Sequence, residues 1–378
     1  MRVLHLADTH LGYSAYRKAT EQGVNQREMD VYDAFTRCVD YALKTRPDLV
    51  LHAGDLFDSV RPTNRAITVA VQQILRLSEG KIPFVVISGN HETPKLRETG
   101  SIFTIFEHLE HVYPIYKNHY ETISLKLNDE TVCIHAVPQC QSPDEFDVNM
   151  KKISVDKNAD YNLLLAHGAV KGIKEFKMNE FNELFIPLKS LSKDFDYIAL
   201  GHYHMYTKLQ GNAFYAGSTE RLSFTEADSQ KGCLEIELGQ HLKYRFIPVQ
   251  TRTMIDTPTL DCSTLRVDQI VQRVKEIIKG IGPTEKIIRL RLENIPAHIQ
   301  RGIDYHQIQE FGKTAMHFEI KSVPMKSETT MVEEGHTMKS LADEFKDFLT
   351  TQQYPEEKML LNLGLQYIQK LEEQEKKP

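Results

Sequence analysis

The sequence Phe-Val-Val-Ile-Ser-Gly-Asn-His-Glu, residues 84–92, shows the pattern that recurs along this chain and predicts its fold. Its first four residues are apolar and mostly β-branched, which predicts a short strand buried on both faces. A serine and a glycine follow, and then an amide, an imidazole and a carboxylate in direct succession. This order predicts a strand that carries metal-binding side chains at its carboxyl end.

Four other segments repeat this pattern along the chain. Each has an apolar run, at residues 3–7, 49–53, 163–166 and 197–200, that ends on residues of metal-binding type. Side chains at the ends of neighbouring buried strands converge on one edge of a sheet, where α/β folds place their sites. Each motif alone is weak evidence, but the set together predicts one metal centre built from Asp8-Thr9-His10, Gly54-Asp55, Gly89-Asn90-His91-Glu92, His167-Gly168 and Gly201-His202-Tyr203-His204.

The residue types narrow the choice of metal. Aspartate, asparagine and histidine without a thiolate suit divalent ions of intermediate hardness, such as Mn²⁺, Fe²⁺ or Zn²⁺. Asp55 lies between the two sets of motifs and is the candidate to bridge a pair of ions. A single histidine in an apolar run is usually structural, so His5, His52 and His135 are interpreted as structural residues.

The segments between the motifs predict an α/β fold. Residues 27–45 and 64–77 have apolar side chains at the spacing of amphipathic helices, and a further helix is expected over 100–108. Residues 122–127 and 131–137 predict a hairpin that turns at Asn128-Asp129. Strands at 214–217 and 232–238 complete a first unit near residue 250. We expect two βα halves that face each other with mixed sheets.

The rest of the chain predicts a second, smaller α/β unit and a helical end. Residues 265–278 and 305–311 are expected to be helical, and 286–292 and 315–320 to be strands. A polar link leads to two amphipathic helices, the first around Leu341, Phe345 and Phe348 and the second around Leu361, Leu365 and Ile368. Their apolar stripes either fold back on their own domain or, as we favour, dock on another chain.

The composition excludes several classes of protein. The 378 residues are 41% hydrophobic and 26% charged with a mean hydropathy of −0.40, and no apolar run approaches the roughly 20 residues that cross a bilayer. We therefore expect no membrane association. The first residues enter a predicted strand without an export signal, and the five cysteines lack metal-binding spacing. A reducing cytoplasm is the expected location.

The charge balance limits any nucleic-acid site to a local surface. A net charge of −6 and a pI of about 6.3 argue against a protein whose whole surface binds nucleic acid. Basic residues nevertheless follow the motifs in loops expected at the metal edge, where they would attract a polyanion. Solvated surface charge is the better explanation for any one of them, and only their clustering favours a site: Arg17, Lys18, Arg27, Arg61, Arg65, Lys95, Arg97, Lys171, Lys174 and Lys177.

The motif series resembles that of the calcineurin-like metallophosphoesterases. Within that superfamily the chain is similar to the SbcD nuclease family, prokaryotic relatives of the meiotic-recombination-eleven break-repair nuclease. The segments that carry this likeness, which covers essentially the whole chain, are DTHLGY (8–13), AGDLFDSVRP (53–62), SGNHETP (88–94), ALGHYH (199–204) and YAGSTERLSF (215–224). His-Leu-Gly-Tyr after the first motif and Gly217-Ser218-x-x-Arg221 separate it from general phosphatases.

The resemblance implies an architecture and partners. It implies two mixed β-sheets in a sandwich flanked by helices, with a small α/β cap domain and C-terminal helices. The implied domains are a nuclease domain (1–250), a DNA-binding cap (251–322), a linker (323–337) and helices that dock on a partner ATPase (338–378). It further implies two Mn²⁺ ions, cleavage of double-stranded DNA ends, hairpins and single strands, an SbcC-type coiled-coil ATPase as partner, and a nucleoid-associated homodimer. The dimer would join residues 64–77 and 100–108 in a four-helix bundle.

The resemblance also assigns roles to residues by matching motif. His91 would contact the scissile phosphate and protonate the leaving oxygen. Asp58 stands where many relatives have histidine and the related phosphatases have aspartate, so it is expected to orient His91. One ion would be held by Asp8, His10, Asp55 and His204, and the other by Asp55, Asn90, His167 and His202. The implied DNA-binding residues are Arg17, Lys18, Arg61, Arg65, Lys95, Arg97 and Arg221.

Two other functions remain open from the sequence. The motifs themselves fix only metal-assisted hydrolysis of a phosphoester, so a phosphatase or a small-molecule phosphodiesterase is the first alternative. Its catalytic unit would end near residue 250 and would need neither a cap nor a docking tail. A catalytically inactive scaffold for a DNA-bound ATPase is the second, and the complete set of ligand residues argues against it.

Overall fold

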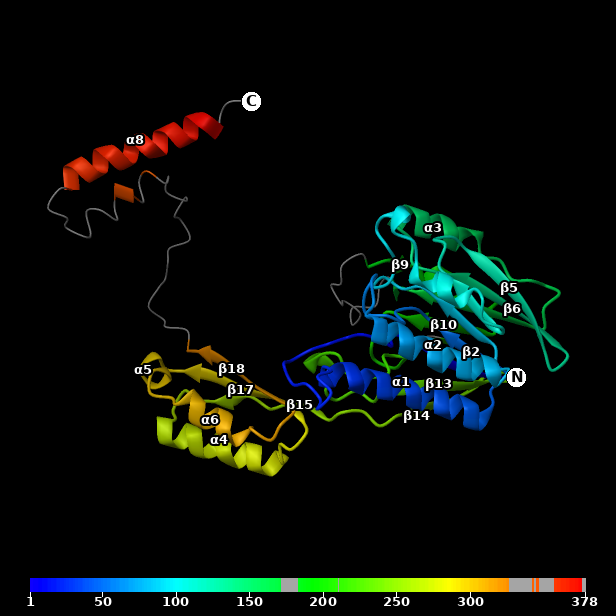
Figure 1. The fold of residues 1–378 in the computed structure, drawn as a ribbon, viewed down its shortest axis with the longest axis horizontal. Coiled ribbons are helices and arrows are strands. Elements are labelled where there is room, and N and C mark those ends of the chain that lie inside the picture. Colours follow the sequence, from blue (N-terminus) through cyan, green and yellow to red (C-terminus); the bar gives the residue numbers. More distant parts are fainter. Residues whose placement is uncertain (171–182, 210, 326–341, 343–344, 347–356, 376–378) are drawn as a thin grey trace. The chain divides into compact units, whose positions relative to one another are not determined.

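The computed structural model describes residues 1–170, 183–209, 211–325, 342, 345–346 and 357–375 (Figure 1). Contacts between residues divide the chain into two compact units, Met1–Pro324 and Met325–Pro378. All five motifs of the sequence belong to the first unit.

The first sheet is mixed and has six strands in the order β14-β13-β1-β2-β3-β4. Its four parallel strands are β1 (Arg2–Leu6), β2 (Leu49–His52), β3 (Phe84–Ile87) and β4 (Val112–Ile115). Every residue of β2 and β3 is buried, as their continuous apolar sequences predict. Two antiparallel strands, β13 (Gly232–Glu237) and β14 (Lys243–Pro248), extend the sheet beside β1. The edge strand β14 was not predicted, since it begins with three exposed polar residues.

The second sheet is also mixed, in the order β11-β12-β10-β7-β6-β5. Its strands are β5 (Glu121–Leu127), β6 (Glu130–Val137), β7 (Tyr161–His167), β10 (Tyr197–Gly201), β11 (Thr207–Lys208) and β12 (Ala213–Tyr215). β6, β7, β10 and β12 are parallel, whereas β5 and β11 are antiparallel to their neighbours. The predicted turn between β5 and β6 is confirmed: Asn128 and Asp129 have φ angles of 49° and 68°, which a two-residue hairpin turn requires.

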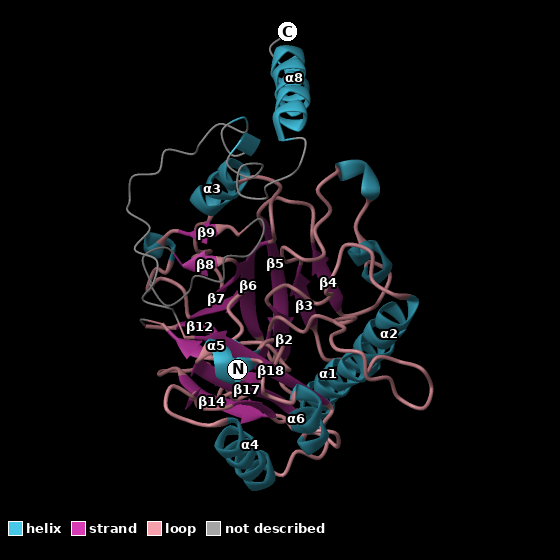
Figure 2. Ribbon diagram, turned by 90° about the vertical axis from the view of Figure 1, so that its left-hand side faces the viewer, coloured by secondary structure: helices cyan, strands magenta, loops and turns pink. Residues whose placement is uncertain are grey.

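The two sheets pack face to face and helices cover both outer faces. Val3, Leu51 and Val85 of the first sheet share one buried cluster with Leu163 and Ala199 of the second. The outer side of the first sheet packs against α1 (Gln26–Thr45) and α2 (Asn64–Glu79), and that of the second against α3 (Pro143–Lys152) (Figures 1 and 2). The predicted α/β sandwich is confirmed.

One predicted helix of this unit is wrong, and one helix was not predicted. Residues 100–108 do not form an α-helix; the region holds two 3-10 helices, Arg97–Thr99 and Ile102–Phe106, separated by Gly100 at φ 71°. The helix α3 was not predicted although its start carries known signals. The Ser142 side chain accepts a hydrogen bond from the Glu145 N–H, and Pro143 occupies the first turn. Short elements complete the unit: β8 (Ala169–Val170), β9 (Phe185–Ile186) and 3-10 helices at Leu188–Ser190 and Phe224–Glu226.

A small α/β layer follows β14 within the same unit. Its strands β15 (Met254–Asp256), β16 (Leu260–Asp261) and β18 (His317–Pro324) all pair in parallel with β17 (Ile287–Ile295). The helices are α4 (Val267–Ile281), α5 (Ala297–Gln300) and α6 (Tyr305–Phe311). α4, α6, β17 and β18 match the predicted helices and strands to within a few residues, whereas β15, β16 and α5 were not predicted. α4 buries Ile270, Val274 and Ile278, four residues apart, in the core of this layer.

In the second unit the structure describes α8 (Glu357–Glu375). Its side chains at Met359, Leu363 and Tyr367 are 68%, 50% and 63% exposed. The first of the two predicted C-terminal helices and most of the predicted linker fall outside the described residues. Among the helices that the structure describes, none combines the length and apolar character that crossing a membrane would require.

Candidate metal centre

The seven predicted ligands lie at the carboxyl ends of five strands, three in one sheet and two in the other. Asp8 and His10 follow β1, Asp55 follows β2 and Asn90 follows β3. The facing sheet contributes His167 at the end of β7, and His202 and His204 after β10. Because β1, β2 and β3 are parallel, as are β7 and β10, each set of strand ends opens at one edge of its sheet. The structure therefore brings together residues that are up to 196 positions apart in the sequence.

The donor atoms form three overlapping groups, the third of which is His10, Asp55 and His91. In the first, Asp8, His10 and His204 offer atoms that all lie within 4.8 Å of one another, and the Nε2 atoms of the two histidines are 3.2 Å apart. In the second, Asp8, Asp55 and His167 meet in the same way. The His167 Nε2 atom lies 3.3 Å from Asp55 Oδ2.

Asn90 and His202 join the second group. The Asn90 Oδ1 atom lies 2.9 Å from His167 Nε2 and 3.2 Å from His202 Nδ1. Asp55 reaches both groups, since its Oδ2 atom is also 3.8 Å from His10 Nε2. This arrangement of a shared carboxylate between two sets of inward-facing donors is the one that the sequence predicts for two neighbouring ions.

The chemistry of the donor set fits divalent cations. Asp8 Oδ2 is buried and has no hydrogen-bond partner among the described residues, and Asp55 Oδ2 is buried 3.3 Å from His167 Nε2. An uncompensated buried carboxylate is costly, and a bound cation removes that cost. Burial raises the pKa of Asp55, but the charge of His167 and its hydrogen bond outweigh burial and hold that pKa well below its usual range. Burial lowers the pKa of His167, yet Asp55 and Asp8 raise it to about 9. Asp55 is thus held as an anion next to a protonated His167, and a bound cation would take the place of that proton.

Each of the four histidines has its outer ring nitrogen bonded to a fixed acceptor. His10 Nδ1 lies 3.2 Å from Asp58 Oδ1, and His204 Nδ1 lies 3.2 Å from Glu226 Oε1. His202 Nε2 lies 3.1 Å from Glu183 Oε1, and His167 Nδ1 lies 2.8 Å from the Ala53 carbonyl oxygen. Carboxylate and carbonyl oxygens accept the ring proton and so leave the inner nitrogen as the metal-binding atom.

The backbone at the centre is held in an uncommon conformation. Asp8, His10, Asp55 and His202 have φ angles of 50°, 51°, 54° and 99°, a region that residues other than glycine rarely adopt. Such conformations persist only where the surrounding structure enforces them, and they concentrate at functional sites. The strain marks these four positions as a site independently of their side chains.

A glycine of the third motif is required by space. A Cβ atom at Gly89 would collide with the Asp55 carboxylate and with its backbone nitrogen. The Gly89 N–H in turn donates a 2.8 Å hydrogen bond to Glu92 Oε1, which holds the loop closed. Glu92 belongs to the third motif, but no role was predicted for it from the sequence. The structure shows that it shapes the loop that carries Asn90 and His91.

His91 lies at the edge of the centre and is 30% exposed. Its ring packs edge-on against His10, with the ring centroids 4.6 Å apart. Its Nδ1 atom lies 3.1 Å from the backbone carbonyl oxygen of Asp58, which can only accept, so Nδ1 carries the hydrogen. Proton exchange with a substrate therefore belongs to Nε2.

The Asp58 side chain is predicted to orient His91, and the structure gives it a second and closer partner, His10. Its carboxylate lies 3.2 Å from His10 Nδ1 but 3.8 Å from His91 Nδ1, which is too long for a hydrogen bond. The carboxylate therefore orients the ligand His10, and His91 is held by the carbonyl of the same residue. The local sequence does not distinguish these two roles, because the carboxylate and the backbone carbonyl belong to the same residue, Asp58, after β2.

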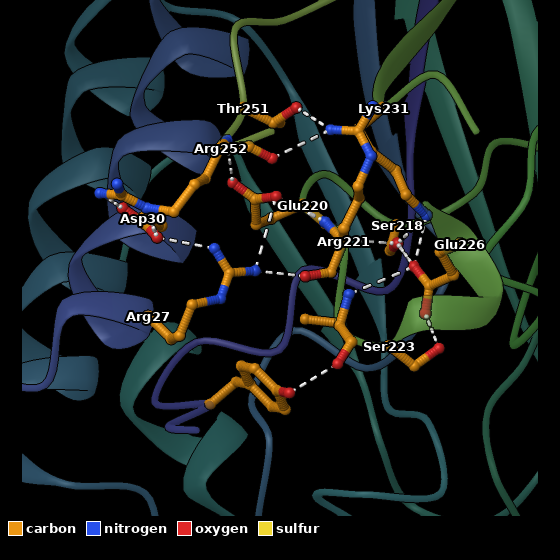
Figure 3. Close-up of polar contacts among 12 residues, drawn as sticks. Arg27, Asp30, Ser218, Glu220, Arg221, Ser223, Glu226, Lys231, Thr251 and Arg252 are labelled. Atoms are coloured by element: carbon orange, nitrogen blue, oxygen red, sulfur yellow. Dashed lines mark hydrogen bonds and ion pairs between the residues drawn. The ribbon is translucent and has the colours of Figure 1, made fainter. Parts of the chain in front are cut away.

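A buried polar network holds the Glu226 carboxylate that bonds His204, and Figure 3 shows its members Ser218, Glu226 and Lys231. Glu226 Oε2 accepts a 2.5 Å hydrogen bond from Lys231 Nζ and a 3.2 Å bond from Ser218 Oγ. Lys231 also donates to the His204 carbonyl oxygen at 2.7 Å. Burial raises the pKa of Glu226, but Lys231 and His204 outweigh it and lower that pKa far below its usual range. Glu226 and Glu183 were not predicted, because each lies in a segment away from its histidine, His204 or His202, and no local sequence pattern marks it.

Two of the predicted basic contacts have structural roles instead (Figure 3). Arg221 donates to the carbonyl oxygens of Ala227, Ser229 and Arg252 and to the Thr251 hydroxyl. Arg27 is fully buried beside Asp30 and Glu220 and also donates to the Arg221 carbonyl oxygen. Guanidinium groups engaged in this way join the Gly217–Arg221 segment to α1 and to the start of the cap. The surroundings of Arg221 do not support its prediction as a DNA contact.

The other predicted basic residues differ in their surroundings. Arg17 and Arg61 are exposed. Lys18 pairs with Glu285 at 2.9 Å and Arg65 with Glu28 at 3.5 Å. Lys95 is exposed and lines a cavity beside Asn90. The side chain of Arg97 and all of Lys171, Lys174 and Lys177 lie outside the described residues.

Comparison with known proteins agrees with this geometry. The family model described as calcineurin-like phosphoesterase matches residues 1–206, which include all seven predicted ligands. The chain belongs to this family. It is accordingly a metal-dependent phosphodiesterase, and the family predicted from the motifs is confirmed.

Within the family, the chain is similar to proteins named DNA double-strand break repair protein Mre11. The protein from Sulfolobus acidocaldarius is 28% identical over 374 residues, covering 94% of this chain and 92% of the relative. That from Methanococcus maripaludis is 33% identical over 243 residues, or 61% and 60% of the two chains. That from Saccharolobus solfataricus is 31% identical over 205 residues, or 54% and 49%. The chain is thus similar to Mre11 proteins, and the last two matches extend over only about half to three-fifths of each relative.

Proposed function

We propose that this protein is a Mn²⁺-dependent DNA nuclease that acts in double-strand-break repair, with 3′-5′ exonuclease activity on duplex ends and endonuclease activity on single strands and hairpins. The observation that carries the proposal is the pair of ligand groups around Asp55. It occurs in a chain whose similarity to a break-repair protein continues through the cap, well past the part shared with the whole family.

The ligands divide between two ions in this proposal. Asp8, His10, Asp55 and His204 hold one ion, and Asp55, Asn90, His167 and His202 hold the other. When bound, two ions of this kind neutralise the charge of a phosphodiester and generate a nucleophile from water at neutral pH. The neutral amide of Asn90 limits the negative charge of the set. The carboxylates that fix the outer nitrogens of His10, His202 and His204 hold the set in place before substrate binds.

His91 acts on the leaving group in this mechanism. Its Nδ1–H donates to the Asp58 carbonyl oxygen, so the ring gives up or takes a proton at Nε2. A protonated Nε2 placed at the scissile phosphate stabilises the charge that develops there and transfers its proton to the departing oxygen. The edge-on packing against His10 fixes the ring at the border of the metal groups.

DNA reaches the centre along its basic border in this proposal. Arg17, Arg61, Lys95 and Arg97 are the candidate phosphate contacts, with Lys18 and Arg65 available once they exchange their pairs with Glu285 and Glu28 for phosphate. A surface of this kind suits a chain with a negative net charge, because only one face has to attract the polyanion.

Partners and location belong to the same proposal. The exposed apolar residues of α8, Met359, Leu363 and Tyr367, suit docking on the coiled coil of an SbcC-type ATPase. We further propose a homodimer in the cytoplasm, associated with the nucleoid. The four-helix bundle predicted for its interface loses one helix pair, because residues 100–108 contain a short 3-10 helix, so α2 is the remaining candidate.

The direct test is nucleotide release from a 3′-labelled linear duplex by the purified chain with Mn²⁺ and with EDTA. The proposal predicts release that requires Mn²⁺. A protein that hydrolyses bis-(p-nitrophenyl) phosphate but releases no nucleotide from duplex or single-stranded DNA, with the ATPase present or absent, would instead be a phosphatase or a small-molecule phosphodiesterase.

A further inference from the structure

His52 makes a buried hydrogen bond that no step of the proposed mechanism uses. It is the last residue of β2, shortly before the ligand Asp55, and it is fully buried. Its Nε2 atom lies 2.7 Å from the hydroxyl oxygen of Thr9, which is also fully buried. Thr9 stands between the ligands Asp8 and His10, so the bond joins the end of β2 to the middle of the first motif.

A buried imidazole is unfavourable at this position of the strand. The other three residues of β2 are apolar, and the His52 ring packs edge-on against Phe84, with the ring centroids 6.3 Å apart. Its Nδ1 atom is buried and has no hydrogen-bond partner among the residues that the structure describes. A buried polar atom without a partner lowers stability, and a leucine would avoid that loss. Since residues that break the pattern of an element in this way concentrate at functional sites, His52 is better explained by the neighbouring metal centre than by the sheet.

The backbone around Thr9 requires restraint. The residues before and after it, Asp8 and His10, have φ angles of 50° and 51°, which are unfavourable for side chains other than glycine. The N–H groups of Asp8 and His10 donate to carbonyl oxygens of the loop after β2, at 3.0 and 2.9 Å. These bonds fix the two ligands, and the side-chain bond to His52 fixes the residue between them. A strained conformation persists only where surrounding contacts enforce it.

We infer that His52 is a positioning residue of the metal centre, which acts through Thr9. Its hydrogen bond holds the ligands Asp8 and His10 in the conformation in which both can bind the same ion. The inference deepens the proposed function and rests on it, because it takes over the division of the ligands between two ions. The ion that Asp8 and His10 share depends on this bond, whereas the ligands of the other ion that follow β3, β7 and β10 do not.

The test separates metal affinity from stability. Isothermal titration of the metal-free protein measures Mn²⁺ binding, and chemical denaturation measures the unfolding free energy, for the wild type, His52→Leu, Thr9→Val and the double variant. Each single variant is expected to bind one of the two Mn²⁺ equivalents roughly tenfold more weakly, at the lower end of the loss caused by removing a support of a metal ligand. The double variant removes both polar groups, so its stability is expected to return towards that of the wild type while its metal affinity does not.

Two conservative variants and one control complete the test. His52→Gln carries an amide that can reach the hydroxyl, and Thr9→Ser keeps the hydroxyl itself, so both are expected to keep most of the Mn²⁺ affinity. Tyr197→Phe is the matched control, because it removes a 2.8 Å hydrogen bond to another buried histidine, His5 of β1. It is expected to lose stability but to bind both equivalents of Mn²⁺ as the wild type does.

Three results overturn the inference. Wild-type Mn²⁺ affinity of Thr9→Val means that the hydroxyl does not position the ligands. Recovery of affinity together with stability in the double variant means that the bond serves the fold alone. An equal loss of affinity in Tyr197→Phe means that the loss of any buried hydrogen bond disturbs the centre. The proposed function fails separately, when the wild type binds two equivalents of Mn²⁺ but releases no nucleotide from DNA, and the titrations then still decide the role of His52.

Discussion

A histidine binds a metal well only when its ring is fixed, and at the scale of single residues this protein fixes four rings through their outer nitrogens. Motif spacing was sufficient to predict the inward-facing residues, since each follows a recognisable strand. The outward partners could not be predicted in the same way. Glu183 and Glu226 reach His202 and His204 from segments about 20 residues away, and nothing in the local sequence distinguishes them from surface carboxylates.

Asp58 allows the two interpretations of its role to be separated. Because its carboxylate bonds His10 Nδ1, Asp58→Asn is expected to weaken Mn²⁺ binding by roughly 10- to 100-fold, with turnover recovering at saturating Mn²⁺. Isothermal titration of the metal beside steady-state kinetics measures both effects. The exposed Asp129→Asn serves as the matched control. Unchanged metal affinity with a lower kcat would restore the view that the carboxylate orients His91.

Glu226 is expected to matter for stability as well as for the ligand it holds. Glu226→Ala leaves Lys231 buried without its carboxylate, and removing one member of a buried ion pair costs about 3–5 kcal/mol of unfolding free energy. Glu237→Ala, which breaks an exposed pair with Lys243, is expected to cost less than about 1 kcal/mol. Chemical denaturation of the two variants at pH 7 compares them. Equal losses of unfolding free energy would mean that the buried Glu226–Lys231 pair stabilises the fold no more than the exposed Glu237–Lys243 pair does.

At the scale of elements, apolar periodicity was enough to predict most strands of both sheets and α1, α2, α4 and α6. Periodicity did not predict the structure where a single turn sets the path of the backbone. Gly100 in the left-handed region divides the segment after β3 into two 3-10 helices, and apolar spacing alone does not report that. Arg27 and Arg221 were misassigned for a related reason. Sequence shows that a residue is basic, but not whether its guanidinium meets solvent or backbone carbonyl oxygens.

The junction between α1 and the cap gives a prediction with a pH dependence. Arg252 donates to both carboxylate oxygens of Asp30 on α1, at 2.6 and 2.8 Å. Burial raises the pKa of Asp30, but the hydrogen bonds and charges of Arg252 and Arg27 outweigh it and lower that pKa below its ordinary 3.8. A carboxyl group with a lowered pKa in the folded state stabilises fully above its unfolded pKa, and this contribution is lost as the pH falls through the folded value.

Asp30→Asn is therefore expected to lower the unfolding free energy by roughly 3 kcal/mol at neutral pH, and the difference from wild type is expected to shrink below about pH 4. Unfolding free energies of both proteins at pH 7 and pH 3 provide the measurement. Asp33→Asn is the matched control on the same helix, since its pair with Arg37 is exposed. A difference that persists undiminished at pH 3 would show that the Asp30 charge is not the cause.

At the scale of the whole molecule, the site and the proposed docking segment belong to different compact units. The sequence predicted the metal unit, because its motifs coincide with strand ends. The exposed apolar residues of α8 suit the proposed docking but do not identify the partner. Removal of residues 338–378 is expected to abolish co-purification with an SbcC-type ATPase and to leave Mn²⁺-dependent cleavage within about twofold of wild type. Tyr367→Ala with Leu363→Ala is the milder version, with the same expected direction. Retained co-purification of the truncated protein would place the docking surface elsewhere.

In the proposed function, the ligand groups hold metal while His91 transfers a proton to the leaving oxygen. The most direct measurement is nucleotide release from a linear duplex by wild type and His91→Ala, at equal and independently measured manganese content. The account predicts two equivalents of manganese in both proteins and a loss of roughly 10²- to 10⁴-fold in release by the variant. Release at the wild-type rate by a metal-loaded His91→Ala protein would contradict it.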